Sequence, residues 1–515
     1  MKLAYSQDLK RIDALAAAKY RIPLARLMER AAGAALRVLR RKAGSFPGKK
    51  IGILSGKGHN GGDGLALARL LKKKGASVKV FLAAAPGDLS AETARQYQKA
   101  KAARVPLETM GKKLNPARAK AFFDSSDLLV DGLLGTGLSR APRGLVKALI
   151  QKANRSGKPI LALDVPSGFS ADEGRPLGEA IRARWTVTFG LPKPGFYMPG
   201  APSYTGEILL DKIGFPPALL QESFLSAELT DARMVKGFLP RYDGEVHKGT
   251  RGRVLVVAGS PGLTGAAALC AWGAQRIGAG LVTVACAKSI YPILAVKLTE
   301  SMTAPLPETG GGFLSPKAEG KLLGLSQRMD SLVIGPGLGR NPKTARLLQK
   351  LLPRLRAPMV LDADALFLLA GKGSWLKRAL APALLTPHSG EAARLLGTTA
   401  EAVERRRLDI AKQIAREYNA VVVLKGPHTV IADPQGRVRI NPTGNRGLAT
   451  GGTGDVLSGI LGGLLAQGLK PFDAAAAGVY LHGLAGEKAS QMLGPDGLLA
   501  GDLLPILPGL LKRVR

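Results

Sequence analysis

Short apolar segments alternate with glycine-rich or polar loops along nearly the whole chain, and this alternation constrains the fold more than any other feature. Lys50–Ser55 is predicted to be a buried strand, and the loop GKGHNGGDG, a helix over Leu65–Lys74 and a second strand over Ser77–Leu82 follow it. This order is typical of an α/β unit with a parallel sheet. Because ligands of open α/β sheets bind beyond the carboxyl ends of strands, we expect functional residues in the loops that follow strands.

The length of the chain and an interruption of this alternation predict two domains. A chain of 515 residues is too long for one ordinary core. The alternation is lost between about Gly214 and His247, where Pro216-Pro217 and an irregular charged segment indicate a linker. We therefore expect one domain over residues 1–218 and another over residues 228–515. A hydrophobic content of 46% and a charged content of 22% are typical of soluble globular domains.

The sequence carries no recognisable signal for export or membrane insertion. Its first residues, MKLAYSQDLKRID, lack an uninterrupted apolar core. No run of about 18 apolar residues free of charge follows. The two cysteines, Cys270 and Cys286, lie in apolar segments without a metal or disulfide pattern. These features predict a cytoplasmic protein without a membrane partner.

The net charge of +36 is the compositional feature that most suggests a nucleic-acid partner. However, the basic residues are dispersed, for example in Lys72-Lys73-Lys74 and Arg405-Arg406-Arg407. Aromatic residues make up only 5% of the chain, too few for an obvious base-stacking platform. We interpret the charge mainly as solvated surface that can also attract anionic substrates.

The loop after the first strand contains a glycine pattern known from phosphate-binding loops. Gly56, Gly58 and Gly61 satisfy GxGxxG, which suggests a Rossmann dinucleotide site. Such a site also requires an acidic residue at the end of the second strand, yet VKVFLAAAPG has no acid before Asp88. An ordinary hydride-transferring Rossmann site is therefore disfavoured, whereas a phosphate or a ribose still suits the free amides of this loop.

Polar side chains follow the successive predicted strands of the N-terminal half. They are Asn60, Asp63, Asp131, Asp164 and Lys193. One such residue alone is more simply explained as part of a turn or a helix cap. Because the carboxyl ends of parallel strands meet at one edge of a sheet, five of them indicate a functional site.

Strands of the C-terminal half also end in polar or glycine-rich loops, among them GPGLG, DAD, TPHSGE and KGPHT. Lys425, at a predicted strand end, can meet a phosphate as a point charge. No histidines are paired at zinc-ligand spacing such as HExxH, so no zinc site is expected. His388 and His428 lie on site loops and are binding candidates, whereas His482 lies in an apolar helix and is expected to be a core residue.

The most informative stretch, Asn441–Gly468, passes from a glycine-rich loop into a predicted helix that begins at Asp455. Free N–H groups and the helix dipole make such a junction an anion site. The glycines of the loop offer little side-chain surface for packing, and Asp455 either caps the helix or faces the bound anion. We interpret the stretch as a phosphoryl-transfer site in which Asp455 takes a proton from a substrate hydroxyl. The helix N-terminus is expected to lower the pKa of Asp455, so that it is ionised at neutral pH.

The ordered motifs of both halves resemble a family of metabolite-repair enzymes. GKGHNGGDG, VDGLLGTGL, LDVPSG and FGLPKPG resemble the NAD(P)H-hydrate epimerase domain. The C-terminal half is similar to the ADP-dependent NAD(P)H-hydrate dehydratase in HKGTRGRVLVVAGS, IGPGLG, LDADAL, TPHSGE, VVLKG and NPTGNRGLATGGTGDVLSGI. The resemblance implies a Rossmann-like α/β/α sandwich followed by a ribokinase-like α/β domain.

The resemblance also implies a bifunctional enzyme that acts on NADH or NADPH whose nicotinamide ring has taken up water at C6. The first domain, an isomerase, would interconvert the two C6 epimers. The second domain, a lyase, would phosphorylate the hydroxyl of the S form at the expense of ADP and eliminate phosphate, giving NAD(P)H, AMP and phosphate. The implied cofactors are K⁺ in the first domain and Mg²⁺ in the second. The implied partners are small-molecule substrates and further copies of the chain.

Site residues follow from the same resemblance. Asp164 would be the acid/base residue of the epimerase, with Lys193 as its partner, and Asp455 the general base of the dehydratase. In the first domain the hydrated dinucleotide would contact His59, Asn60, Gly61, Gly62, Asp63, Gly135, Thr136, Gly137, Leu138, Ser139, Arg140, Ala141 and Asp164. In the second it would contact Ala268, Gly337, His388 and Asp455, and the nucleotide would contact Lys425, Gly426, Pro427, His428, Thr429 and Gly454. Potassium would be held by Asn60, Asp131 and Ser167, whose oxygen atoms suit a hard cation.

Two other functions share some of these features. A ribokinase-type small-molecule kinase, such as a hydroxymethylpyrimidine or pyridoxal kinase fused to another domain, has GTGD and uses ATP, but the HNGGDG and DVPSG loops disfavour it. A basic nucleic-acid-binding protein with a degenerate enzyme fold would account for the charge. It would bind DNA in a salt-dependent manner without turning over nucleotide.

Overall fold

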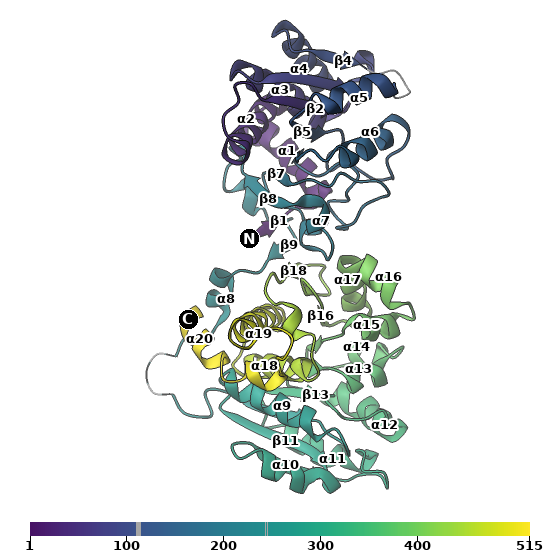
Figure 1. Ribbon diagram of the computed structural model, residues 1–515. Helices are drawn as coiled ribbons and strands as arrows, with labels where there is room; N and C mark the ends of the chain where they lie inside the picture. Colours follow the sequence, from purple (N-terminus) through teal and green to yellow (C-terminus); the bar gives the residue numbers. More distant parts are fainter. Residues whose placement is uncertain (110–114, 243, 245) are drawn as a thin grey trace. The chain divides into compact units, whose positions relative to one another are not determined.

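The computed structural model describes residues 1–109, 115–242, 244 and 246–515, and these divide into two compact units (Figure 1). Lys2–Ala227 form the N-terminal unit, and Glu228–Arg515 with Met1 form the C-terminal unit. Both units are built on largely parallel sheets with helices between the strands, which confirms the predicted α/β class. None of the helices in the described residues is long and apolar enough to span a membrane.

The sheet of the N-terminal unit is parallel and reverses its direction of growth beside its first strand. In spatial order the strands are β4 (Leu107–Thr109), β3 (Ser77–Leu82), β2 (Lys50–Ser55), β5 (Leu128–Gly132), β6 (Ile160–Leu163), β7 (Trp185–Phe189) and β8 (Glu207–Asp211). The chain runs from β2 outward to β4 and then returns to the other side of β2 at β5. Ligands of open sheets bind in the crevice that such a reversal creates, here between the carboxyl ends of β2 and β5.

Two apolar cores cover the two faces of this sheet. Ile51 and Ile53 of β2 face a core that helices α1–α3 complete, whereas Leu54 faces a second core built with α5 and α6. The alternation follows from the two-residue repeat of a strand. The helices of this unit are α1 (Ser6–Tyr20), α2 (Leu24–Ala43), α3 (His59–Lys73), α4 (Ala91–Ala102), α5 (Pro116–Asp124), α6 (Gly144–Arg155) and α7 (Pro202–Thr205).

The sheet of the C-terminal unit has the same kind of reversal. Its strands lie in the order β18 (Val438–Ile440), β17 (Val430–Ala432), β16 (Val421–Leu424), β15 (Ala383–Leu385), β14 (Met359–Leu361), β13 (Ser331–Ile334), β10 (Arg253–Val257), β11 (Leu281–Ala287) and β12 (Met302–Leu306). The pairs from β16 to β12 are parallel, and β17 and β18 are antiparallel additions. The reversal lies at β10, so the crevice forms between the carboxyl ends of β10 and β13.

Helix α18 (Thr453–Ala466) crosses α9 (Thr264–Arg276) at a distance that only glycine permits. A Cβ atom on Gly459 would lie 2.0 Å from the carbonyl oxygen of Cys270, and one on Gly273 would lie 2.5 Å from that of Val456. Packing therefore explains the close approach at Gly459 in the helical half of the Asn441–Gly468 stretch. Even in the loop half, a Cβ on Gly452 would come within 2.6 Å of Leu269.

The remaining helices of the C-terminal unit cover the sheet and carry several site loops. They are α8 (Ala232–Phe238), α10 (Tyr291–Lys297), α11 (Glu319–Ser326), α12 (Pro342–Leu351), α13 (Asp364–Leu369), α14 (Ser374–Lys377), α15 (Ser389–Leu396), α16 (Ala400–Arg405), α17 (Arg407–Tyr418), α19 (Pro471–Leu493) and α20 (Leu507–Val514). His482 of α19 is buried, and its Nε2 lies 3.0 Å from the carbonyl oxygen of Thr453, as expected of a core histidine with a satisfied ring.

Candidate active sites

The first glycine-rich motif forms the beginning of α3 rather than a free loop. The helix starts at His59, whereas the sequence pattern predicts a start at Leu65. The missing side chain of Gly61 allows this, because a Cβ there would lie 1.9 Å from the carbonyl oxygen of Gly56. His59–Asp63 therefore occupy the first turns of a helix. The Gly61 and Gly62 N–H groups donate to the Gly58 carbonyl oxygen, so the N–H groups that can meet an anion are those of His59 and Asn60.

A cavity of about 770 Å³ lies in the N-terminal unit at the carboxyl ends of β2 and β5. Most of the substrate-binding residues predicted for this half line it: His59, Asn60, Asp63, Gly135, Thr136, Gly137, Leu138, Ser139, Arg140 and Asp164. Gly61, Gly62 and Ala141 belong to the same segments but do not line the cavity. Leu24, Leu27 and Met28 of α2 form part of its wall. Phe189, Ile213 and Phe215 also line it, so the cavity joins a polar rim to an apolar wall.

Asp164 faces this cavity with a buried lysine behind it. The Lys193 side chain is fully buried and donates hydrogen bonds to Asp164 Oδ1 and, at 2.6 Å, to Thr188 Oγ1. Asp164 Oδ1 also accepts from the Thr188 hydroxyl at 3.2 Å and from the Phe189 N–H at 3.1 Å. The backbone of Asp164 has a φ of 63°, and such strained residues cluster at functional sites. The predicted pair thus has fixed geometry.

The three predicted potassium ligands, Asn60, Asp131 and Ser167, all form hydrogen bonds with the backbone of Leu133 or Leu134. Asp131 accepts from the Ser167 N–H at 2.7 Å and from the Ser167 hydroxyl at 2.6 Å. Asn60 donates through Nδ2 to the Leu134 carbonyl oxygen at 2.7 Å, whereas its Oδ1 is buried without a hydrogen-bond partner in the described residues. Burial raises the pKa of Asp131 to about 6, although the bonds from Ser167 and Leu133 oppose the rise. A buried acceptor without a donor, beside a buried carboxylate, is suited to a bound cation.

Asp13 of α1 is a lining residue of the same cavity that the sequence analysis did not single out. Leu9, Lys10 and Asp13 share one face of α1 because they are three and four residues apart, and all three line the cavity. The sequence feature that could have indicated Asp13 is its position next to the apolar stripe that Ile12 and Ala16 form.

In the C-terminal unit, α18 begins at a glycine and leaves its first amides available. Its N-cap is Gly452 with a φ of 92°, and no side chain caps it. Asp455 lies in the first turn and does not act as the cap, so of the two sequence alternatives the capping role is wrong. The N-terminus of α18 keeps the geometry of an anion site.

Lys425 lies beside this helix N-terminus and is held by a buried carboxylate. Its Nζ donates to Asp362 Oδ1 at 2.9 Å and lies 3.8 Å from Glu391 Oε2. Asp362 also accepts from the Ser458 hydroxyl at 2.7 Å. A Cβ on Gly454 would be 3.4 Å from Lys425 Nζ, so this predicted nucleotide-binding glycine leaves room beside the ammonium group. Burial opposes the charge of Lys425, but Asp362 and Glu391 raise its pKa overall.

The protonation state expected for Asp455 is wrong. Burial and the negative charge of Asp362 raise the pKa of Asp455 to about 7, and Lys425 only partly offsets them. A helix N-terminus contributes about 0.3–1 kcal/mol, less than the ~1.4 kcal/mol that corresponds to one pKa unit. The effect of the helix dipole on the pKa of Asp455 is therefore smaller than the combined effects of burial and of Asp362, which is distant in sequence. A base with a pKa near neutrality is well matched to proton abstraction at neutral pH.

The predicted nucleotide loop Lys425–Thr429 is folded tightly and supported by a buried arginine. Gly426 and His428 have positive φ angles of 138° and 51°, and the Thr429 hydroxyl donates to the Gly426 carbonyl oxygen at 3.0 Å. Arg407 donates to the carbonyl oxygens of Leu424 and Lys425 at 2.9 and 3.1 Å. His428 Nδ1 is buried without a hydrogen-bond partner in the described part of the chain.

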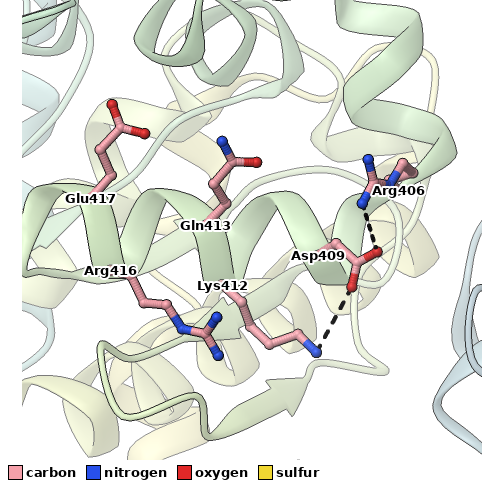
Figure 2. A pocket seen from close by; sticks show the side chains of 6 residues that line it. All are labelled: Arg406, Asp409, Lys412, Gln413, Arg416 and Glu417. Carbon is pink, nitrogen blue, oxygen red and sulfur yellow. Dashed lines mark hydrogen bonds and ion pairs between the residues drawn. The ribbon is translucent and has the colours of Figure 1, made fainter.

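The sequence analysis interpreted Arg405-Arg406-Arg407 as solvated surface. This interpretation is wrong for Arg407, which is only 2% exposed. The expectation holds for the opposite face of α17, where Figure 2 shows a shallow hollow lined by Arg406, Asp409, Lys412, Gln413, Arg416 and Glu417. Asp409 pairs there with Arg406 at 3.3 Å and with Lys412 at 3.9 Å. Exposed pairs of this kind contribute about 0–1 kcal/mol, so this hollow is an ordinary charged surface.

Besides Asp455, the three residues predicted to contact the hydrated dinucleotide in the C-terminal unit differ in how they are placed. Gly337 has a φ of 60°, and a Cβ there would lie 2.6 Å from the Leu263 carbonyl oxygen, so only glycine suits this position. His388 caps α15, with its Nδ1 accepting from the Gly390 N–H at 3.0 Å, and its ring remains exposed. Ala268 is 1% exposed within α9 and offers almost no surface to a ligand.

Comparisons with known proteins agree with this division into two sites. Residues 24–195 match the family model of the YjeF-related protein N-terminus, and residues 254–509 match that of NAD(P)H-hydrate dehydratase. The bifunctional NAD(P)H-hydrate repair enzyme Nnr of Moorella thermoacetica is 46% identical over 528 aligned positions, which cover 100% of this chain and 97% of that protein. The enzyme of the same name from Escherichia coli is 37% identical, with 98% of this chain and 92% of that protein covered.

A solved structure supports the fold of one part of the chain. The ADP/ATP-dependent NAD(P)H-hydrate dehydratase of Bacillus subtilis, crystallised with ATP and Mg²⁺, has a TM-score of 0.50 and 34% identity. It covers 55% of this chain and 98% of its own. The Rossmann-like and ribokinase-like classes predicted for the two halves are thereby confirmed. With both family models matched and relatives aligned along the full length, the chain belongs to the family of bifunctional NAD(P)H-hydrate repair enzymes.

Proposed function

We propose that the chain repairs NADH and NADPH that have been hydrated at C6 of the nicotinamide ring. The N-terminal unit interconverts the two C6 epimers, and the C-terminal unit dehydrates the S epimer at the expense of ADP. We assign these activities to the two predicted domains, residues 1–218 and 228–515, and expect a cytoplasmic homo-oligomer. The supporting observation is that one chain carries both an Asp164–Lys193 pair at a large cavity and an Asp455–Lys425 group at a helix N-terminus.

In the N-terminal unit, the cavity of about 770 Å³ is large enough for a nicotinamide nucleotide portion and combines polar and apolar walls. The first amides of α3 and the Gly135–Arg140 loop would hold phosphate and ribose. Asp164 takes up or returns the proton at the C6 hydroxyl, and Lys193 fixes its orientation.

A potassium ion suits the oxygen cluster of this unit. Asn60, Asp131 and Ser167 would hold it, and the orphaned Asn60 Oδ1 is the observation that supports the fit. A bound monovalent cation would neutralise the buried Asp131 carboxylate and keep the Leu133-Leu134 segment in place at the cavity edge.

In the C-terminal unit, Lys425 and the first amides of α18 bind the phosphates of ADP, with the Lys425–Thr429 loop around the nucleotide. Asp455 removes the proton from the C6 hydroxyl as that oxygen takes the phosphoryl group. Loss of phosphate from C6 together with a proton from C5 then restores the C5=C6 double bond of the ring. The described residues contain no cluster of three or more His, Cys, Asp or Glu side chains for a metal ion. Mg²⁺ suits this site as an ion held mainly by nucleotide phosphates and water, where it would neutralise phosphate charge.

The test is to incubate a mixture of hydrated NADH epimers with the protein and to follow recovery of absorbance at the NADH band. We expect complete recovery with ADP and Mg²⁺, none without nucleotide, and stoichiometric AMP and phosphate. Turnover of an unrelated vitamin alcohol with ATP, without recovery of NADH, would instead support a ribokinase-type kinase. DNA binding that weakens with salt, without any nucleotide turnover, would contradict both enzymatic functions.

A further inference from the structure

The wall of the N-terminal cavity contains a carboxylate that the functions above do not use. Asp13 lies on the same face of α1 as Leu9 and Lys10, and all three line the cavity together with Asp164. Two catalytic carboxyl groups from separate elements in one cavity are a common arrangement in which one accepts a proton and the other donates it.

Helix α1 is attached firmly next to the loop that carries Lys193. The Ala4 N–H donates to the carbonyl oxygen of Pro192 at 3.0 Å, and the Ser6 N–H donates to Asp172 Oδ1 at 2.7 Å. Ile12 and Ala16 are fully buried on the packed side of the helix. The position of Asp13 relative to Lys193 and Asp164 is therefore set by the fold of this unit.

Asp13 and Asp164 differ in their hydrogen bonds. Asp164 Oδ1 accepts hydrogen bonds from Lys193, from the Thr188 hydroxyl and from the Phe189 N–H, so this oxygen already acts as a hydrogen-bond acceptor in the free protein. No donor within the described residues reaches the carboxyl group of Asp13. Asp13 is thus free to carry a proton and to donate it to a bound ligand.

The surrounding charges favour the protonated form of Asp13. Burial, followed by the charge of Asp164, raises the pKa of Asp13 to about 6, while Lys193 acts in the opposite direction. Burial, followed by the charges of Asp164 and Asp13, raises the pKa of Asp63 well above its ordinary value. The other charged or titratable groups that line the cavity are Lys10, Lys57, His59 and Arg140.

We infer that Asp13 is the proton donor of the epimerisation and that Asp164 is the proton acceptor. This inference rests on the proposed epimerase function. The C6 hydroxyl takes the Asp13 proton and leaves as water, while the N1 lone pair forms an N1=C6 double bond. Water then adds to either face of C6, the electron pair of that double bond returns to N1, and the added water loses a proton to Asp164. One proton has moved from Asp13 to Asp164, and solvent exchange restores the starting state.

The test measures epimer interconversion without ADP, by chromatographic separation of the two hydrates, so that the dehydratase is silent. Asp13→Asn keeps the shape of the side chain but cannot transfer a proton. We expect kcat to fall about 10²–10⁴-fold with KM little changed, and Asp13→Glu to recover part of the rate. The matched control is Asp88→Asn, an exposed carboxylate away from the cavity, which should keep wild-type kinetics.

The pH profile separates a proton donor from a merely structural residue. Because the donor must be protonated, the wild-type kcat should fall as pH rises through about 6, and Asp13→Asn should lack that limb. A wild-type kcat in Asp13→Asn, or a loss confined to Asp63→Asn, would overturn the inference. An Asp13→Asn variant that is slow but whose kcat still falls as pH rises through about 6 would also overturn the inference. If the wild-type protein itself fails to interconvert the epimers, the proposed epimerase function is at fault instead.

Discussion

The two sites combine an aspartate and a lysine in different ways. In the N-terminal unit, Lys193 pairs directly with Asp164, the carboxylate that faces the cavity. In the C-terminal unit, Lys425 pairs with Asp362 at 2.9 Å, a carboxylate that is 1% exposed. Among the described residues no cation lies within ion-pair distance of Asp455.

The difference shows how the same residue types are given different tasks. Because burial and the negative charge of Asp362 outweigh the charge of Lys425, the pKa of Asp455 is raised to about 7, which suits it to accept a proton from a hydroxyl. At the same time Lys425 remains next to Gly454 and the helix N-terminus, where a phosphate would bind. In the N-terminal unit the lysine is fully buried, so we propose that it orients Asp164 rather than binding ligand.

Removing the base should have the largest effect. Asp455→Asn keeps the volume of the side chain and removes its proton affinity, so kcat for ADP-dependent recovery of NADH from the S hydrate should fall about 10²–10⁴-fold. Binding of ADP, measured by calorimetry, should change little because Lys425 and the loop remain. Asp496→Asn, an exposed carboxylate paired with Arg446, is the matched control. Recovery at the wild-type rate in Asp455→Asn would rule out the assigned role.

Removing the buried lysine should damage the other site selectively. Lys193→Met leaves Asp164 without its cation, and breaking a buried ion pair costs about 3–5 kcal/mol. We expect a lower melting temperature and a loss of epimerisation of about 100-fold or more, with dehydration of pure S hydrate unchanged. Lys152→Met, on the exposed side of α6, controls for the loss of a charge. An equal loss of both activities would argue against two separate sites.

Removing a cation ligand should have a smaller effect that depends on the salt. Asn60→Ala deletes the buried oxygen that lacks a partner. The K⁺ concentration needed for half-maximal epimerisation should rise at least about tenfold, with activity restored at saturating K⁺. The measurement is a K⁺ titration at constant ionic strength with a large organic cation as replacement. Independence from K⁺ in the wild-type protein would contradict the potassium assignment.

The sequence predicted the elements and the side-chain types of both sites but not their electrostatics. The strands β2 and β3 have the bounds that their apolar runs predict, because a strand buried on both faces needs a continuous apolar run. The start of α3 at His59 was missed, because glycines in a motif indicate a loop unless the close approach of Gly61 to Gly56 is known.

Residues that act through distant partners were the hardest to predict. Arg407 belongs to a run of three arginines, and only the fold shows that it lies beneath Leu424 and Lys425. The pKa of Asp455 depends on Asp362, which follows a different strand. Asp13 is next to an apolar stripe, and its neighbour Asp164 is far away in sequence. In each case the important contact joins segments that are far apart in the sequence, so the spacing of residues cannot reveal that they are close in the fold.

The pH dependence of kcat/KM for ADP-dependent recovery of NADH, measured from the S hydrate between about pH 5.5 and 8.5, tests the contrast between the two sites most directly. Asp455 must be ionised to act as a base, so the rate should rise with pH and reach half its maximum near 7. Asp362→Asn removes a neighbouring negative charge and should move this limb to lower pH by about one unit. A flat wild-type profile over this range, or a limb that stays in place in Asp362→Asn, would contradict the account.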